Sequence, residues 1–525
     1  MGFGEDNIDR ALAITKQAGL KYLYHPGPFE TWGHFKLNKN QFPEGLESMR
    51  RCVEKAKREG IMLGVHTLSN FITTNDAYVT PVPDKRLGTV GTGALVQPVD
   101  AKQTEITLGS SAFFNEYKNS NLKTVMIGEE LVRYDRLSEN APWRLLECQR
   151  GAWGTRAAAH EAGDTVLMLA DHAYKVFLTN AELSREVAQN IARLFNETGL
   201  RQISFDGLEG NRSTGMGNYG EILFTTAWYN TLSEEIKKHY IADASRTSHY
   251  FWHIYTRMNW GEPWYAGFRK SQTEYRMKNQ KYFRRNFMPG MLGWFSMRAE
   301  TSVEDIEWML ARSAAYDAGY AFVTSFKTLG ENGRTEQILA LLGRWEKARM
   351  SGAFPDTLKK EMENLDHEYH LETAGENQWD LYRVTTALFS HAPVERQPGE
   401  PRFTRFSFNN PYEEQPLTFT LQATKDTECK DITLEMDNNK TLTFPMTLKK
   451  GQILSYQGGD SAELLDKTRH RIKTIALEGG NYTISHGDHT FAVDAEFTGG
   501  AVPELQIELK TLSGPVRLTG KLEHR

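Results

Sequence analysis

Two carboxylic acids close a short apolar segment near the middle of the chain. Residues 201–210 read RQISFDGLEG, so that in a strand Ser204 and Asp206 face one side while Phe205 faces the other. The glycines allow a sharp turn directly after Asp206, and Glu209 places a second carboxylate in that turn. A turn or helix cap would explain such an acidic end without chemistry. Other predicted strand ends are also rich in reactive side chains, and this favours a functional site.

Polar and aromatic side chains follow two earlier predicted strands. They are Tyr24 and His25 at the end of the strand at 20–25, Trp32 in the loop beyond it, and His66 near the end of the strand at 61–67. In a (β/α)8 barrel, the reacting groups come from the carboxyl ends of strands and from the loops after them. These residues are therefore candidates for the same site as Asp206.

The densest aromatic stretch of the chain is HYFWHIYTRMNWGEPWYAGFRK, residues 249–270. Its candidate site residues are Trp252, Arg257, Trp260, Glu262, Trp264 and Arg269, and Trp294 follows in the predicted strand at 288–297. Flat ring faces beside charged hydrogen-bonding groups are what a sugar site needs. The sequence NWGEP would interrupt a continuous strand, so we expect a loop at the mouth of the site.

Helices and strands alternate around these residues. Predicted helices at 8–17, 46–57, 181–199, 222–239, 303–319 and 335–349 alternate with strands at 20–25, 61–67, 201–207, 248–255, 288–297 and 320–326. This order predicts an α/β fold with parallel strands. We expect a (β/α)8 TIM-like barrel built from residues 1–67 and 173–380.

Two β-rich regions break this alternation. Residues 68–172 lack a convincing helix and predict an inserted β module, which we expect to form a wall of the substrate pocket. Residues 381–525 contain short alternating strands bounded by Gly, Asn, Asp and Pro, which is typical of an antiparallel β-sandwich. The fold class is therefore α/β plus β, with an interrupted barrel followed by a sandwich.

Composition excludes several kinds of partner. The chain has 62 Lys and Arg against 67 Asp and Glu, a net charge of −5, so it lacks the excess basic charge that nucleic acid binding needs. No apolar run approaches the roughly 20 residues that cross a bilayer. The 3 cysteines are too far apart for a zinc or redox motif, and the glycine-rich segments lack the context of a nucleotide loop, so we expect neither metal nor cofactor.

Two segments resemble the α-galactosidase/raffinose-synthase clan of retaining glycoside hydrolases. Residues 19–65, GLKYLYHPGPFETWGHFKLNKNQFPEGLESMRRCVEKAKREGIMLGV, resemble the clan in a strand leading to a Trp-containing loop, a Phe-Pro-x-Gly before a helix, and a Gly-Ile-x-x-Gly strand. Residues 178–207, LTNAELSREVAQNIARLFNETGLRQISFDG, resemble its helix and strand before the nucleophilic aspartate. The clan's first barrel strand has no counterpart, so either the chain is truncated or another segment closes the barrel.

The resemblance implies roles for the acidic residues. Asp206 takes the place of the nucleophile at the end of barrel strand four, with Glu209 as a neighbouring site residue. The clan's general acid/base is an aspartate from a later strand, but no aspartate stands at that place here. Glu262 is the nearest suitable carboxyl group and our choice for this role, with Glu300 and Glu209 as competitors.

We therefore expect a retaining, exo-acting glycosidase that acts on a complex carbohydrate outside the cytoplasm, in the periplasm or as a secreted protein. Five arginines near the predicted mouth suggest an anionic sugar, although solvated surfaces would explain them equally well: Arg246, Arg257, Arg269, Arg284 and Arg285. A non-catalytic glycan-binding protein on a degenerate barrel is one alternative. A polysaccharide lyase or sugar isomerase using His25 or His66 is another.

Overall fold

The structure is a computed structural model that divides into two compact units. It describes residues 1–115, 122–244, 253–258, 268–272, 276–288, 290–393, 397–398, 400, 403–424, 427–437, 440–477, 481–499 and 504–521. The first unit comprises Met1–Lys16, Lys21–Gly261 and Asn279–Met291, and the second comprises Gln17–Leu20, Glu262–Lys278 and Leu292–Arg525. Each unit is considered by itself.

A parallel sheet forms the centre of the first unit. Its strands run in the order β1 (Tyr22–His25), β2 (Met62–Leu68), β13 (Gln202–Asp206), β14 (Ile241–Ala244) and β15 (Arg257–Met258). Each of the four neighbouring pairs is parallel. Parallel strands place their carboxyl ends at one edge, so the loops after them lie together.

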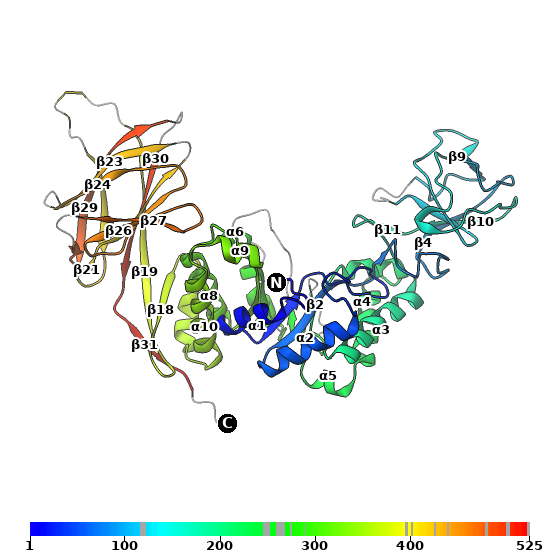
Figure 1. The fold of residues 1–525 in the computed structure, drawn as a ribbon, viewed down its shortest axis with the longest axis horizontal. Coiled ribbons are helices and arrows are strands. Elements are labelled where there is room, and N and C mark those ends of the chain that lie inside the picture. The colour runs from blue at the N-terminus through cyan, green and yellow to red at the C-terminus, as the bar shows by residue number, and fades with distance from the viewer. Residues whose placement is uncertain are drawn as a thin grey trace. The chain divides into compact units, whose positions relative to one another are not determined.

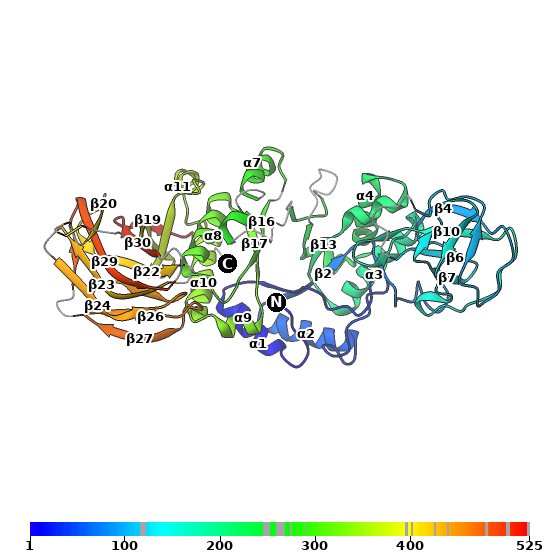
Figure 2. The same ribbon diagram turned by 90° about the horizontal axis from the view of Figure 1, so that it is seen from above.

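Helices precede and follow the strands of this sheet along the chain. They are α1 (Ile8–Gln17), α2 (Leu46–Arg58), α3 (Ala181–Thr198), α4 (Asn218–Thr231), α5 (Glu234–Lys238) and α7 (Lys278–Arg285), with the short helix η2 (Leu208–Thr214) after β13. The ring of Phe205 lies 5.2 Å from that of Trp228 on α4, edge to face. Phe205 therefore marks the helix-covered face, and Ser204 and Asp206 mark the opposite, inner face. Figure 2 shows β2 and β13 beside α3 and α4.

Local signals place the ends of these helices. Asn180 precedes α3 and its side chain accepts a hydrogen bond from the Leu183 amide at 2.9 Å. Gly199 ends α3 in the left-handed conformation, with φ 81°.

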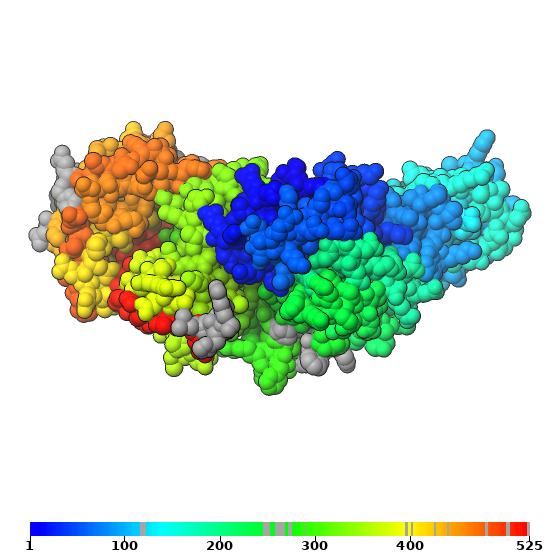
Figure 3. Space-filling view, turned by 60° about the horizontal axis from the view of Figure 1, so that its bottom comes forward, coloured from blue at the N-terminus to red at the C-terminus, as the bar shows by residue number. Residues whose placement is uncertain are grey.

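The first two helices are joined by ion pairs between Asp9 and Lys55, and between Lys16 and Glu59. The dark blue surface of Figure 3 belongs to this N-terminal part of the chain.

The inserted module is built almost entirely of strands. They are β3 (Ile72–Thr73), β4 (Thr89–Ala94), β5 (Ile106–Leu108), β6 (Thr124–Ile127), β7 (Glu130–Arg133), β8 (Arg136–Leu137), β9 (Trp143–Leu146), β10 (Thr165–Leu169), β11 (Asp171–His172) and β12 (Val176–Phe177), with one short helix, η1 (Ala152–Gly154). Two small antiparallel sheets share an apolar core, and Figure 1 shows them in cyan. The third sheet, β11-β12-β3, lies where the chain leaves and re-enters the α/β part.

A buried glutamate organises the loops of this module. Glu130 accepts two hydrogen bonds from Arg150 at 2.9 and 2.8 Å, one from His160 Nε2 at 2.8 Å, and one from the Gly151 amide at 2.8 Å. Burial alone would raise the pKa of Glu130, but these hydrogen bonds outweigh it and lower the pKa. Glu130 thus holds residues 150–160 together through the Arg150 and His160 side chains and the Gly151 amide.

The second unit begins with helices around a strand pair. Strands β16 (Met291–Ser296) and β17 (Gly319–Val323) pair with each other, and the helices are α6 (Phe268–Gln272), α8 (Val303–Tyr316), α9 (Phe326–Glu331), α10 (Thr335–Met350) and α11 (Asp356–Met362). Ser302 caps α8 by accepting a hydrogen bond from the Asp305 amide at 3.1 Å.

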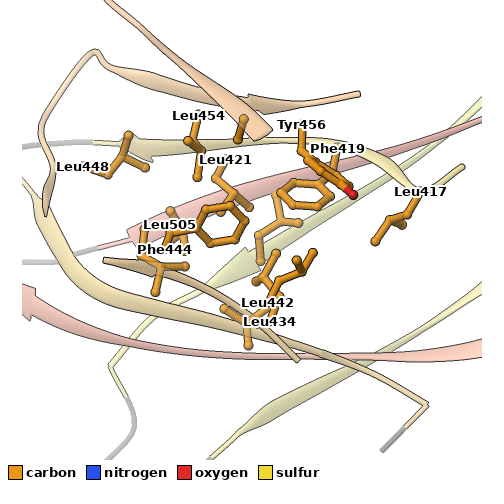
Figure 4. Packing of buried hydrophobic residues seen from close by; sticks show 14 of the residues in the cluster. Leu417, Phe419, Leu421, Leu434, Leu442, Phe444, Leu448, Leu454, Tyr456 and Leu505 are labelled. Atoms are coloured by element: carbon orange, nitrogen blue, oxygen red, sulfur yellow. The ribbon is translucent and has the colours of Figure 1, made fainter. Parts of the chain in front are cut away.

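The rest of the second unit consists of antiparallel strands. They are β18 (Glu368–Gly375), β19 (Gln378–His391), β20 (Thr404–Asn410), β21 (Gln415–Pro416), β22 (Thr418–Thr424), β23 (Glu428–Met436), β24 (Lys440–Leu448), β25 (Ile453–Tyr456), β26 (Ser461–Leu465), β27 (Arg471–Ala476), β28 (Thr483–Ile484), β29 (Gly487–Thr498), β30 (Glu504–Leu512) and β31 (Val516–Thr519). An eight-stranded and a four-stranded sheet contribute side chains to one apolar core, as Figure 4 shows for Phe419 of β22 and Phe444 of β24. These strands start at Glu368, before the predicted boundary at 381.

Several predicted elements are confirmed and two are wrong. The helix at 8–17 and the strand at 201–207 are present as α1 and β13. The helix predicted at 222–239 is instead split into α4 and α5, and the unpredicted strand β14 follows. Of the strand predicted at 248–255, residues 253–255 are in no strand and the remainder lies outside the described residues. The expected barrel strands form two separate sheets among the described residues. One is the five-stranded sheet that ends with β15, the other is the pair β16 and β17, and no hydrogen bonds between described residues join these two sheets into a closed ring.

Candidate active site

Asp206 ends β13 on the inner face of the parallel sheet. Its side chain is 31 % exposed, and its Oδ1 accepts a hydrogen bond from the Gly207 amide at 2.8 Å. Its Oδ2 lies 3.8 Å from Nε2 of His66 on β2. The backbone carbonyl of Asp206 accepts hydrogen bonds from both the amide and the hydroxyl of Ser69. A partly exposed carboxylate is thus held between the ends of two neighbouring strands.

The turn after Asp206 requires glycine. Gly207 adopts the left-handed conformation with φ 65°, and a Cβ there would lie 2.8 Å from the ring of Phe71. Gly210 also packs so closely against Phe71 that a Cβ would collide with the ring. Phe71 itself is fully buried. The loop therefore turns sharply over an aromatic ring that comes from the beginning of the inserted module.

A hydrogen-bond network fixes this loop relative to β2. Asn70 Nδ2 donates to the Gly210 carbonyl and to Ser213 Oγ, both at 3.2 Å, and its Oδ1 accepts from the Thr179 hydroxyl. Ser213 in turn donates to the Thr179 carbonyl at 2.7 Å. Because Asn70 and Thr179 stand at the two ends of the insert, the network connects both ends to the Asp206 loop.

One row of polar residues crosses four strands below Asp206. In the strand register, His66 pairs with Ser204, Ser204 with Asp243, and Asp243 with Arg257. Residues paired in this way point to the same face of a sheet. The inner face therefore carries an imidazole, a hydroxyl, a carboxyl and a guanidinium side by side.

Asp243, the one acid of this row, is deeply buried. It is 3 % exposed, and burial raises its pKa above the ordinary aspartate value, which the positive charge of Arg257 and the hydrogen bond from Gln202 oppose only in part. Gln202 Nε2 donates to Asp243 Oδ2 at 3.2 Å. Three buried atoms of this layer have no hydrogen-bond partner: Gln202 Oε1, Ser204 Oγ and Asp243 Oδ1. Unpaired buried polar atoms are expensive, and functional sites are where proteins tolerate them.

Gln202 and Tyr24 occupy the next row toward the amino ends of the strands. Gln202 pairs in register with Gly64 and folds over it, so that a Cβ at position 64 would collide with the Gln202 side chain. Tyr24 also pairs with Gly64 and is half-buried. Tyr24 therefore lies on the same face of the sheet as Asp206, at a deeper level.

Trp32 and Glu209 lie in loops at the carboxyl ends of the strands. The Trp32 amide donates to Thr73 Oγ1 at 3.1 Å, and its side chain packs against the cluster that contains Leu68 and Phe71. Glu209 is half-buried in the first turn of η2, three residues after Asp206. Both therefore lie close to the candidate site along the chain or through shared neighbours.

His25 lies on the opposite face from Tyr24 and belongs to the core. It is 3 % exposed, with its ring 5.3 Å from that of Phe3 and 6.1 Å from that of Phe42. Its Nδ1 accepts a hydrogen bond from the Gly27 amide at 3.0 Å, and burial lowers its pKa to about 4. Because adjacent residues of a strand face opposite sides, His25 cannot share the Asp206 face, and we withdraw it from the substrate-binding set.

Two further predicted residues have structural contacts in the second unit. Arg269 pairs with Asp305 at 2.7 Å and Glu368 at 2.8 Å. Trp294 is 6 % exposed, and its carbonyl accepts a hydrogen bond from Arg276 at 2.7 Å. The competitor Glu300 is exposed. Four other predicted residues lie outside the described residues: Trp252, Trp260, Glu262 and Trp264.

Sequence reasoning missed Asp243 and Gln202 as members of the inner face. The available signal was an aspartate in the short apolar segment IADA, which period two would have aligned with Ser204 once β14 was recognised.

Within the described part of the chain, no three His, Cys, Asp or Glu side chains gather as a metal site. None of the helices in that part is long and apolar enough to span a membrane.

Comparisons with known proteins give a distant likeness to glycoside hydrolases. No protein-family model and no curated protein sequence matches the chain. The chain is similar to an Anoxybacillus α-amylase structure at 11 % identity and TM-score 0.38, covering 91 % of each chain. It is also similar to a GH27 β-L-arabinopyranosidase from Geobacillus stearothermophilus at 9 % identity and TM-score 0.38, covering 94 % of each chain. At such TM-scores the likeness assigns no role to any residue here.

Proposed function

We propose that this protein is a retaining glycoside hydrolase with Asp206 as its nucleophile. The observation that carries the proposal is the position of Asp206: a partly exposed carboxylate at the carboxyl end of a parallel strand, on a polar inner face. Active sites of barrel enzymes are built at this end of the strands. The proposed fold is a (β/α)8 barrel, closed by segments beyond the five-stranded sheet, with a C-terminal β-sandwich.

The hydrogen bonds of Asp206 suit a nucleophile. The Gly207 amide holds Oδ1, which stabilises the ionised carboxylate and fixes its orientation. Oδ2, on the side of His66, is then the oxygen that attacks the anomeric carbon. His66, when protonated, stabilises the negative charge of Asp206 and hydrogen-bonds a sugar hydroxyl.

The second carboxyl group in this proposal is Glu262. Protonated Glu262 donates its proton to the leaving oxygen as Asp206 forms the glycosyl-enzyme, and the resulting carboxylate then activates the water that hydrolyses it. This mechanism requires the two carboxyl groups to lie about 5–5.5 Å apart. Glu209 is the alternative acid within the first unit, because it lies in the same loop as Asp206.

The proposed substrate is a complex oligo- or polysaccharide cleaved from its end, in the periplasm or outside the cell. Arg257 supports an anionic sugar, because it is half-buried and follows Asp243 in the polar row. A guanidinium on the inner face would pair with a carboxylate or sulfate of the substrate. Uronide or sulfated substrates should then be preferred over neutral ones, and Arg257→Leu should remove that preference.

The decisive experiment compares wild type, Asp206→Asn and Asp9→Asn on aryl glycosides and polysaccharides. Asp9 is a suitable control because its side chain is 75 % exposed. We expect Asp206→Asn to lose at least about a thousandfold in kcat/KM, as when a group that acts in the transition state is removed. Asp9→Asn should match wild type, and NMR of the first product should show retained configuration. Full activity of Asp206→Asn would remove this residue from the role.

A polysaccharide lyase is the second candidate, favoured by the imidazole of His66 beside Asp206. Such a pair could abstract a proton next to a uronate carboxyl group. The same assay separates the two reactions, because a lyase produces an unsaturated sugar that absorbs in the ultraviolet and a hydrolase does not. A non-catalytic glycan-binding protein would retain glycans and release no product.

A further inference from the structure

Three aromatic rings lie in contact where the inserted module joins the parallel sheet, and we call them the aromatic stack. The ring of His172 stacks on that of Phe71 at 4.7 Å, with 26° between their planes. The ring of Tyr174 is tilted by 52° against His172 at 4.8 Å and meets Phe71 edge to face at 5.9 Å. The exposure of this stack rises from Phe71, which is fully buried, to Tyr174, which is 56 % exposed. The stack therefore runs from the protein interior to the surface.

The buried end of the stack touches the loop of the proposed nucleophile. Phe71 packs against Gly207 and Gly210, the glycines that follow Asp206. The exposed end consequently lies on the surface next to that loop. The inserted module supplies the two outer rings, because His172 ends β11 and Tyr174 lies in the turn before β12.

Backbone pairing orders the turn that carries the two outer rings. Strand β11 pairs with β12, and β12 pairs with β3 directly after Phe71. The Tyr174 amide donates to His172 Nδ1 at 3.4 Å, and the Lys175 amide donates to the His172 carbonyl at 2.9 Å. A ligand that binds here therefore loses less conformational entropy than one that must first order this turn, which favours binding.

We propose that His172 and Tyr174 form an aromatic platform for a sugar ring on the leaving-group side of the cleaved bond. The inference rests on the proposed function, in which the terminal sugar occupies the Asp206 site and the remainder of the glycan extends outward. Aromatic faces bind the apolar faces of sugar rings, and tyrosine combines such a face with a polar tip. The inserted module thereby selects glycans of two or more units over simple glycosides.

The test compares an oligosaccharide with a small aryl glycoside as substrates. Tyr174→Ala should reduce kcat/KM for the oligosaccharide by about threefold to tenfold, the range of one aromatic contact, and should leave the aryl glycoside unchanged. Tyr174→Trp should restore the loss. Tyr282→Ala is the control, because Tyr282 is 39 % exposed on α7 and outside the stack. Equal effects of Tyr174→Ala on both substrates, or no effect, would overturn the platform.

A binding measurement keeps this test separate from that of the proposed function. If wild type hydrolyses none of the substrates, its retention in polysaccharide-containing native gels is compared with that of Tyr174→Ala. Retention that is weaker in the variant supports the platform although the proposed hydrolase activity fails. Retention that is absent in wild type, or equal in both proteins, overturns the platform.

Discussion

The inner face of the parallel sheet and the apolar cluster around Phe419 and Phe444 in the C-terminal sheets differ in whether their buried side-chain polar atoms have hydrogen-bond partners. In the C-terminal core, the hydroxyl of Tyr456 donates to the Gly459 carbonyl at 2.8 Å and that of Tyr482 donates to the Thr441 carbonyl at 2.7 Å. Below Asp206, buried atoms of Gln202, Ser204 and Asp243 stay unpaired. The C-terminal core thus has the features of a core that stabilises its fold, whereas the inner face below Asp206 keeps buried polar atoms that reduce stability.

Truncating a large buried side chain of the C-terminal core should have the largest effect on stability. Phe444 is fully buried between the two sheets, so Phe444→Ala should lower the free energy of unfolding by about 3–5 kcal/mol. Urea unfolding followed by circular dichroism measures this change. Phe287→Ala should have no effect, because Phe287 is 94 % exposed. A loss below about 1 kcal/mol for Phe444→Ala would show that this core is not what stabilises the sheets.

Replacing Asp243 by the neutral Asn should raise the free energy of unfolding. Because the pKa of Asp243 is raised in the folded protein, its proton favours folding at acidic pH, and that contribution is lost as pH rises through the folded-state pKa. Asp243→Asn should therefore add about 1–3 kcal/mol of stability at neutral pH and little at acidic pH, while activity falls. Thermal unfolding of both proteins over a pH series measures this.

Glu129→Gln provides the control for that series, since Glu129 is exposed in the turn between β6 and β7. Its unfolding temperature should follow the wild-type curve at every pH. If Asp243→Asn is less stable than wild type at neutral pH, the polar row is a structural element and the contrast between the two regions fails.

Removing the unpaired hydroxyl of Ser204 should have the smallest effect. Ser204→Ala replaces a buried group that has no hydrogen-bond partner, so stability should rise by less than about 1 kcal/mol. Ser184→Ala is the matched buried control, because Ser184 Oγ donates to Asn211 Oδ1 at 2.9 Å and its loss should destabilise. Chemical denaturation distinguishes the two signs, and a destabilised Ser204→Ala would indicate that Ser204 makes a stabilising interaction.

Much of the fold follows from patterns that are strong locally. The helix at α1 has the predicted bounds, and the strand β13 ends at Asp206 as its alternation indicates. Strand β14 was missed because it has only four residues and is alanine-rich, so its membership in the sheet depends on neighbours and not on its own preference. The three cysteines are free and buried, which their distance along the chain does not reveal.

The site residues were only partly predictable, because a strand's period does not say which face is the inner one. Tyr24 and His25 were both predicted to bind substrate, although adjacent residues of one strand face opposite sides. Only the register with β2 and the contacts of His25 with Phe3 and Phe42 decide between them. Asp243 likewise becomes a candidate only when β14 is placed beside β13.

The pairing of β3 with β12 has an evolutionary consequence. Ile72 pairs with Phe177 and Thr73 with Val176, so the chain enters and leaves the module at directly opposed positions. A module with adjoining ends can be gained, lost or exchanged as a cassette without separating β2 from β13. Each exchange would place a different hairpin beside Asp206 and leave the parallel sheet that carries it unchanged.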